Sequence, residues 1–375
     1  MTKVKKLNVA IIFGGRSGEH EVSLVSATSV IKNLDKQKYN IIQIGITKGG
    51  EWLVGNDVLK FLKTGQGRNF KQEALSPDAI KNKLVGKKID VVFPVLHGTY
   101  GEDGVIQGLL ELTNVPYVGS GILGSAMAMD KITQKTLCGV QNILMPDWIW
   151  LTKKEWQWTK KSKLVFKKWL AGTEERLGYP MFVKPSNMGS SVGISKVNDR
   201  QELIQGVELA IKYDRRILIE QAIEAAMEIE IAVLGNDKPE VSMAGQVVTS
   251  NEFYDYNAKY VDGKSDVKIP AELPAEVIQD LKNIALQAFS LMDCSGLARV
   301  DFLVNQRGKD WNIYLSELNT MPGFTSISMY PKLWEASGLS YQKLLNILIK
   351  LALEKYREKN KLATSFKVKT DWYKN

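Results

Sequence analysis

Polar side chains able to do chemistry gather near the C-terminal end of the chain, in two neighbouring stretches with strand character. Arg299 and Asp301 are two residues apart in the first stretch, and Glu317 and Asn319 are two apart in the second. Side chains two residues apart on a strand share a face. The short polar segment around Gly308 predicts a hairpin between the two stretches. We therefore expect all four side chains on one face of a sheet.

The chemistry that such a face could support is metal binding. Magnesium prefers oxygen ligands and is usually held by one or two carboxylates together with substrate phosphates, so Asp301, Glu317 and Asn319 suit a nucleotide-bound ion. The alternative is an exposed face with an ordinary ion pair. The opposite, core-facing side is predicted to carry Val300, Phe302, Val304, Tyr314 and Leu318.

Composition narrows the class of protein. The chain has 375 residues, of which 44% are hydrophobic and 24% charged, as in soluble globular proteins of two or three domains. It contains no apolar run of the roughly 20 residues that a membrane helix needs, and its start, MTKVKK, leads directly into a strand, so we expect a cytoplasmic protein. Two cysteines and two histidines provide neither a disulfide framework nor a structural zinc site.

The net charge of +9 favours anionic partners, so nucleic-acid binding is one alternative. The most basic segment, Lys153–Lys168, interleaves tryptophans with lysines and could stack bases. No nucleic-acid motif accompanies it, which favours a solvated, lysine-rich surface.

The first 120 residues alternate short apolar strands with amphipathic helices, which predicts a parallel sheet covered on both sides. The predicted elements are strands at 7–13, 41–46 and 91–94 and helices at 22–34 and 104–112. Ligands of such sheets lie beyond the carboxyl ends of the strands. Two glycine-rich loops follow strands there, and Glu21 and His97 supply their polar groups.

Glycine-rich segments outside this sheet have two interpretations. Gly119, Gly121 and Gly124 form a GxGxxG, which we interpret as a domain exit and alternatively as a nicotinamide site. Lys184 ends a strand and precedes the glycine-serine loop Ser186–Gly193, whose backbone N–H groups could close over phosphates. The next strand, Ile217–Gln221, is predicted at the edge of a small domain.

Seven motifs occur in a fixed order along nearly the whole chain: IIFGGRSGEHEVSLVSA, VLHGTYGEDGVIQGLLE, YVGSGILGSAMAMDK, FVKPSNMGSSVGISKV, FYDYNAKY, ARVDF and ELNTMPGFTSISMYP. Together they resemble the D-alanine–D-alanine ligases of the ATP-grasp superfamily. The resemblance implies a three-domain ATP-grasp fold of mixed α/β and α+β class. Its domains would be an N-terminal parallel-sheet domain at 1–122, a central domain at 123–223 and a C-terminal domain at 224–375 with a lid at 249–268.

The resemblance also implies a nucleotide site between the central and C-terminal domains. The residues that match ATP-binding positions are Lys131, Lys184, Ser186, Gly189, Ser190, Ser191, Glu220, Gln221, Ala222, Ile223 and Glu228. The matching ligands of two Mg²⁺ or Mn²⁺ ions are Asp301, Glu317 and Asn319. Relatives often have Lys-Trp where this chain has Gln221-Ala222, which leaves side-chain contacts to adenine open.

The implied reaction joins two D-alanines through an acyl phosphate, for peptidoglycan precursor synthesis. Arg299 and the Gly323 N–H match its oxyanion donors. Glu21 matches the residue that holds the ammonium of the first D-alanine, and with Ser190 and Tyr260 it matches a trio that closes the lid. His97, Lys259 and Ser328 match substrate-holding groups.

Alternatives to this reaction concern the second substrate and the class of enzyme. Tyr260 favours the dipeptide over the D-alanine–D-lactate product, and a D-alanine–D-serine ligase or another ATP-grasp ligase remains open. The implied partners are D-alanine and ATP, with no nucleic acid or membrane, in a homodimer.

Overall fold

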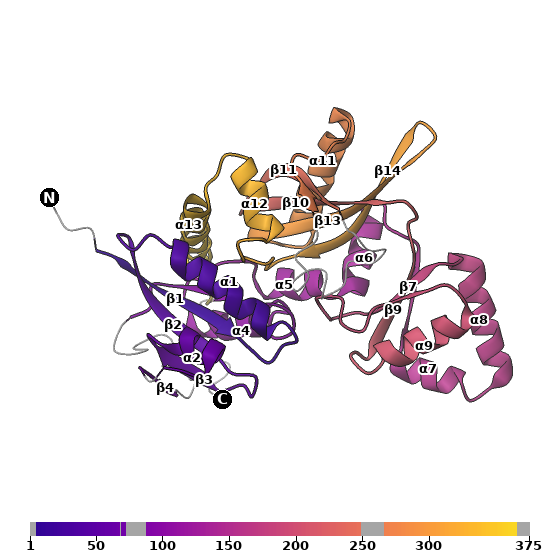
Figure 1. The fold of residues 1–375 in the computed structure, drawn as a ribbon, viewed down its shortest axis with the longest axis horizontal. Helices are drawn as coiled ribbons and strands as arrows, with labels where there is room; N and C mark the ends of the chain where they lie inside the picture. Colours follow the sequence, from indigo (N-terminus) through magenta and orange to yellow (C-terminus); the bar gives the residue numbers. More distant parts are fainter. Residues whose placement is uncertain (1–4, 68, 73–87, 249–265, 366–375) are drawn as a thin grey trace, which may run out of the picture.

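The computed structural model describes residues 5–67, 69–72, 88–248 and 266–365. Three sheets organise these residues, and the C-terminal sheet lies between the N-terminal and central sheets in Figure 1. Among the helices of the described residues, none is long and apolar enough to cross a membrane. The mixed α/β and α+β architecture is the one expected from the sequence.

The N-terminal sheet has the strand order β4-β3-β2-β1-β5. Its strands are β1 (Leu7–Gly14), β2 (Tyr39–Ile46), β3 (Trp52–Gly55), β4 (Phe70–Gln72) and β5 (Val91–Val95). The predicted parallel sheet is confirmed for β1, β2 and β5. The prediction missed β3 and β4, which pair antiparallel at the edge and are too short to show a pattern of their own.

β1 is apolar at consecutive positions, as expected of a strand in a sheet that is covered on both faces. Val9, Ile11 and Phe13 pack in one core with α1 (His20–Asn33) and α13 (Tyr341–Lys359). The alternate residues of β1 pack in a second core with α4 (Val105–Thr113). The first core also contains residues of the C-terminal sheet, so α13 packs in one core with both the N-terminal and the C-terminal sheet.

The central sheet has the order β6-β9-β7-β8. Its elements are β6 (Trp148–Thr152), α7 (Lys153–Thr159), α8 (Lys163–Leu177), β7 (Met181–Pro185), β8 (Ser195–Val197), α9 (Arg200–Ala210) and β9 (Arg216–Gln221). The prediction of an edge strand at 217–221 was wrong, because β9 pairs with β6 on one side and β7 on the other. Its consecutive Ile217, Leu218 and Ile219 are all fully buried, as expected of an internal strand.

The burial of its tryptophans bears on whether the basic segment, Lys153–Lys168, could stack bases. The Trp156 side chain is fully buried, donates its indole N–H to Glu208 and packs against Phe166 and Trp169. Trp156 is therefore a core residue and does not offer a face to bases, whereas Trp158 in the same segment is 64% exposed.

The C-terminal sheet has the order β12-β11-β10-β13-β14. Its elements are β10 (Met227–Gly235), β11 (Glu240–Val248), β12 (Asp266–Lys268), α11 (Ala275–Leu291), β13 (Gly296–Arg307), β14 (Asp310–Asn319) and α12 (Met329–Ala336). The predicted hairpin is confirmed: β13 and β14 pair antiparallel up to Arg307 and Asp310, with Gly308 in the turn. A bulge near Ser316 shifts the register, so Leu315 and not Tyr314 faces the core opposite Phe302.

Two helices connect the sheets. α5 (Ile122–Met129) and α6 (Lys131–Val140) contribute to the core of the C-terminal sheet. At the start of this connection Gly119 has φ +102°, and a Cβ on Gly296 would meet its backbone at 3.1 Å. These glycines permit a close backbone approach at a junction, as expected for a domain exit. The boundaries at 122/123 and 223/224 stay predictions.

Candidate active site

The acidic sheet face forms as predicted. Arg299 pairs opposite Asn319, and Asp301 opposite Glu317, so the four side chains share one face of the hairpin. The Arg299 guanidinium holds Asp301 through two hydrogen bonds of 2.7 and 2.6 Å, and its Nε lies 3.0 Å from Glu230 Oε2 on β10. The face therefore combines the carboxylates of Asp301, Glu317 and Glu230 with one guanidinium, which suits the binding of a metal and of developing negative charge.

Lys131 links this face to the glycine-serine loop. It stands at the first position of α6, and its Nζ lies 3.1 Å from Glu317 Oε1 and donates to the Met188 carbonyl at 2.9 Å. The Lys131 N–H also donates to the carbonyl of Ser186, a fully buried residue. One buried ammonium thus touches both the predicted metal site and the predicted phosphate loop.

Asp130 anchors the same loop, and sequence reasoning missed it. Its carboxylate caps α6 at the Thr133 N–H, accepts two hydrogen bonds from Arg216 and accepts another from Asn187 in the loop. The backbone N–H of Asn187 donates to the Asp214 carboxylate at 2.7 Å. These contacts fix the start of the loop relative to Lys131.

Ser190 lies at the tip of the loop, in the left-handed region with φ +48°, and its hydroxyl donates to Glu19. The expected partner of Ser190 was Glu21, and the structure corrects this. Helix α1 begins at His20, so residues 19 and 21 face different directions. The Glu21 side chain is 59% exposed and pairs with Lys48, which lowers its pKa.

The position of Glu19 explains two of the glycines around it. A Cβ on Gly98 or on Gly189 would lie 2.4 Å from Glu19 Oε2. Both loops therefore need glycine at the point where they approach this carboxylate. Glu19 is 8% exposed, between the loop after β1, the loop after β5 and the glycine-serine loop.

His97 follows β5 and is buried, with both ring nitrogens engaged. Its Nδ1 lies 3.0 Å from the Met321 carbonyl and its Nε2 lies 2.9 Å from Ser26 Oγ. Glu102 Oε1 lies 3.5 Å from Nδ1. Burial lowers the pKa of His97, but Glu102 outweighs it and the pKa is raised overall. For the Glu102 carboxyl, burial acts in the other direction and raises the pKa to about 7.

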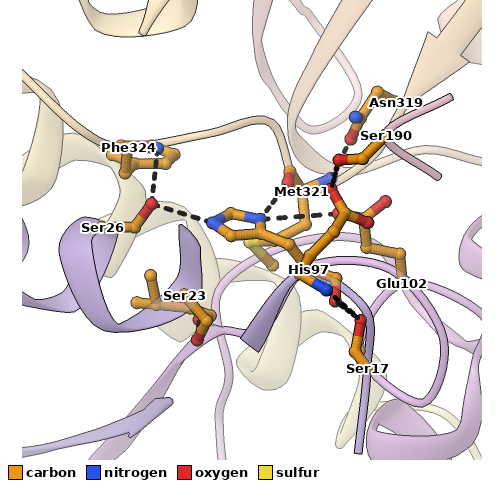
Figure 2. A network of polar contacts seen from close by, with 12 residues as sticks. Ser17, Ser23, Ser26, His97, Glu102, Ser190, Asn319, Met321 and Phe324 are labelled. Carbon is orange, nitrogen blue, oxygen red and sulfur yellow. Dashed lines mark hydrogen bonds and ion pairs between the residues drawn. The ribbon is translucent and has the colours of Figure 1, made fainter. Parts of the chain in front are cut away.

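The loop that carries Gly323 is held by the same network (Figure 2). The Phe324 N–H donates to Ser26 Oγ at 3.3 Å, and Tyr341 donates its hydroxyl to the Phe324 carbonyl at 2.6 Å. A Cβ on Gly323 would lie 2.7 Å from Ser328 Oγ, so two predicted site residues are neighbours. The Ser328 hydroxyl also accepts from the Thr325 N–H at 3.0 Å.

The predicted adenine border contains a buried charge cluster. Glu220 on β9 pairs with Lys184 at 2.5 Å and with Lys135 at 2.8 Å. Burial raises the pKa of Glu220, but the two lysines outweigh it and lower the pKa to about 2. Sequence reasoning missed Lys135, which lies inside α6 with no motif around it.

Gln221 and Ala222, next along the predicted adenine border, make backbone hydrogen bonds. The N–H groups of Gln221 and Ala222 donate to Asp147 and Pro180 carbonyls. Glu228 lies on β10, two residues before Glu230 and hence on the same acidic face.

A cavity of about 300 Å³ lies at the carboxyl ends of β1, β2 and β5, where the sequence analysis placed a ligand region. Its lining includes Gly15, Arg16, Gly50, His97 and Tyr100, together with residues of α4.

Two predicted residues and most of the lid cannot be placed. Lys259, Tyr260 and residues 249–265 lie outside the described residues. Within the described residues no cluster of three or more His, Cys, Asp and Glu side chains forms a ready metal site. The predicted set has two carboxylates and one carboxamide, whose oxygens fit Mg²⁺ when phosphate oxygens complete the shell.

Comparisons with known proteins agree with this geometry. Models of the D-ala D-ala ligase N-terminus and C-terminus match residues 8–120 and 137–350. A D-alanine–D-alanine ligase of Natranaerobius thermophilus is 47% identical over 372 residues, covering 97% of this chain and 99% of its own. The ligase of Thermoanaerobacter sp. is 49% identical over 366 residues, covering 95% and 99%.

Solved structures give the same result. The D-alanine–D-alanine ligase of Coxiella burnetii matches with a TM-score of 0.79 and 35% identity, over 96% of this chain and 97% of that one. VanG, a D-Ala:D-Ser ligase of Enterococcus faecalis, matches with a TM-score of 0.79 and 36% identity over 93% and 100%. An ATP complex of the Bacillus anthracis ligase matches with a TM-score of 0.70 and 30% identity, over 94% and 99%. With its acidic face, glycine-serine loop and full-length matches, the chain belongs to the D-alanine–D-alanine ligase family of ATP-dependent, ATP-grasp enzymes.

Proposed function

We propose that this protein joins two D-alanines to D-alanyl-D-alanine, a peptidoglycan precursor, with hydrolysis of ATP to ADP and phosphate. The observation that carries the proposal is the position of Lys131, whose ammonium touches both Glu317 on the acidic face and Met188 in the glycine-serine loop. A nucleotide triphosphate held by this loop would lie against the acidic face, where phosphoryl transfer depends on positioning and charge neutralisation.

In the first step the carboxylate of one D-alanine attacks the γ-phosphate, giving an acyl phosphate and ADP. Asp301, Glu317 and Asn319 would hold two Mg²⁺ or Mn²⁺ ions, which neutralise phosphate charge when bound. Arg299 holds both oxygens of Asp301 in this structure, so it would release at least one of them to an ion.

In the second step the amine of the other D-alanine attacks the acyl carbon and phosphate leaves. The tetrahedral oxyanion would be stabilised by Arg299 and the Gly323 N–H. Support for the second donor is the rigidity of its loop, which Ser26 and Tyr341 hold at Phe324. Ser328, adjacent to Gly323, and Lys259 would hold the carboxylate of the second D-alanine.

We assign the role expected of Glu21 to Glu19. Glu19 would hold the ammonium of the first D-alanine, with His97 supporting the adjacent loop, and its contact with Ser190 would be completed by Tyr260 of the lid. Closure by the lid would keep water from the acyl phosphate.

The test is ADP release by the purified protein with ATP and Mg²⁺, with products identified by mass. D-Alanine alone, L-alanine, and D-alanine with D-lactate or D-serine are the four conditions. We expect ADP and D-alanyl-D-alanine with D-alanine alone. A predominant ester or D-alanyl-D-serine product would show that the second substrate is not D-alanine, while the assignment as an ATP-dependent ligase would stand. No ADP under any condition would overturn the proposed activity.

Two further assignments follow from family resemblance. We propose a homodimer, which light scattering at micromolar concentration tests directly: a monomer mass would reject it. We also place the reaction in the cytoplasm, where its substrate ATP is found.

A further inference from the structure

Three charged side chains from three elements meet in the interior of the protein: Lys135 of α6, Lys184 of β7 and Glu220 of β9. Both lysines pair with the one carboxylate, Lys135 at Oε2 and Lys184 at Oε1. The side chains of Lys135 and Glu220 are 3% and 6% exposed. Two ammonium groups on a single carboxylate leave a net positive charge in a site largely removed from water.

The two lysines have different surroundings. Lys184 is 17% exposed and lies two residues before the glycine-serine loop. Burial lowers its pKa, but Glu220, and then Glu317 and Glu228 of the acidic face, outweigh burial and raise the pKa overall. Lys135 lies on α6 and is 3% exposed; burial lowers the pKa of its ammonium, and Glu220 acts against that effect. Of these two lysines, Lys184 is therefore the one placed to reach an anion bound between the loop and the acidic face.

If Lys184 turned toward such an anion, Glu220 would lose one of its two partners. A buried carboxylate without a counter-ion is strongly unfavourable, so a lone Lys184–Glu220 pair would resist this exchange. With Lys135 present, Glu220 keeps an ion pair of 2.8 Å whichever way Lys184 points. Lys135 thus removes the obstacle to moving Lys184.

We propose that Lys135 is a positioning residue for nucleotide binding, which stays paired with Glu220 while Lys184 exchanges Glu220 for the phosphates of ATP. The inference rests on the proposed function, which supplies ATP as the anion. No contact between Lys135 and the nucleotide is required.

The test measures ATP binding by calorimetry without D-alanine, in wild type and in Lys135→Met. We expect the Kd for ATP to rise about tenfold or more, because Lys184 stays on Glu220. Lys135→Arg keeps the charge and should retain most of the affinity. Lys355→Met is the matched control: it removes another inward-facing ammonium, which donates to Gly119 at the domain junction, and should leave the Kd unchanged.

Coupling to Glu220 separates this role from a merely structural one. In a Glu220→Gln background no buried carboxylate retains Lys184, so adding Lys135→Met should change the Kd for ATP less than about twofold. In steady-state assays Lys135→Met should raise the KM for ATP and leave kcat and the KM for D-alanine within about twofold. A merely structural defect would change all three constants.

The proposal is overturned if Lys135→Met binds ATP as tightly as wild type, or if its effect is as large in the Glu220→Gln background as in the wild-type background. Should Lys135→Met fail to fold, Lys135→Gln takes its place in both backgrounds, because the coupling needs the effect of the substitution with and without Glu220. A wild type that binds ATP without joining D-alanines would reject the proposed function and leave this binding test intact.

Discussion

Ser190, at the tip of the glycine-serine loop, donates a hydrogen bond to Glu19, at the start of α1. This contact connects the loop expected to cover ATP with the N-terminal sheet expected to hold the first amino acid. Because the glycines at 98 and 189 make room for the same carboxylate, three loops converge on Glu19. We therefore expect binding of the first amino acid near Glu19 to affect the order of the glycine-serine loop.

Glu19→Gln and Glu21→Gln are a matched pair of variants that tests this assignment. Losing the buried Glu19 charge should lower kcat/KM for D-alanine roughly 100-fold, since a buried charged partner is removed. Glu21 is exposed and pairs with Lys48, so its variant should remain within about twofold of wild type. Initial rates of ADP release against D-alanine concentration measure both. The reverse order of effects would restore Glu21 to the site.

Ser26→Ala should affect stability and turnover together. The Ser26 hydroxyl is buried between His97 Nε2 and the Phe324 N–H, so its loss leaves both groups without this partner. We expect a loss of about 1–3 kcal/mol in the free energy of unfolding and a lower kcat, because the Gly323 N–H is less well fixed. Urea denaturation and ADP release measure the two effects. Thr28→Ala on the same helix is the control and should leave kcat unchanged, because the Thr28 hydroxyl donates to the Leu24 carbonyl within the helix and accepts from Lys63.

Much of the acidic face was predictable because it depends on local rules. The spacing of Arg299, Asp301, Glu317 and Asn319, and a turn at Gly308, fix the shared face once the hairpin forms. The bulge near Ser316 was not predictable, since one extra residue leaves no mark in an alternating pattern, and it exchanged Tyr314 for Leu315 in the core.

Contacts between distant segments were the part that the sequence could not reveal. Glu19 and Glu21 are both acidic, and only the start of α1 at His20 decides which one turns inward. Lys135 and Asp130 have partners on β9, 85 and 86 residues away, so no local spacing identifies them. The family resemblance named Lys184 and Glu220 as site residues but not Lys135, the second lysine that pairs with Glu220.

The buried pair of Glu102 and His97 predicts how stability depends on pH. Burial raises the pKa of Glu102 from 4.5 to about 7, so between these values the folded protein binds more protons than the unfolded chain. Stability from this group is therefore complete below pH 4.5 and is lost as pH rises through 7. The raised pKa of His97 acts in the same direction above its usual value.

Glu102→Gln should remove this dependence. Over that interval wild type should lose on the order of 3 kcal/mol more stability than the variant, if Glu102 titrates independently of Glu19 and His97. Urea denaturation of both proteins at about pH 5 and about pH 7.5 provides the measurement. Equal changes in the two proteins would show that Glu102 does not titrate in this range.

Glu317→Gln tests the acidic face with the smallest change in shape. The carboxylate lies opposite Asp301 and 3.1 Å from Lys131 Nζ, and the substitution removes its negative charge while the side chain keeps its volume. We expect ADP release to fall about 100-fold or more, since charge stabilisation at the transferred phosphate is removed, with the unfolding midpoint changed little because the side chain is 39% exposed.

The metal requirement separates two explanations of such a loss. If Glu317 holds an ion, the Mg²⁺ concentration giving half-maximal rate should rise in Glu317→Gln, and Mn²⁺ should restore part of the activity. If Glu317 only orients Lys131, the Mg²⁺ dependence should stay that of wild type while the KM for ATP rises. Glu335→Gln, a change on the exposed end of α12, is the control for charge removal and should leave both dependences unaltered. A Glu317→Gln protein that is folded and fully active would remove this carboxylate from the reaction.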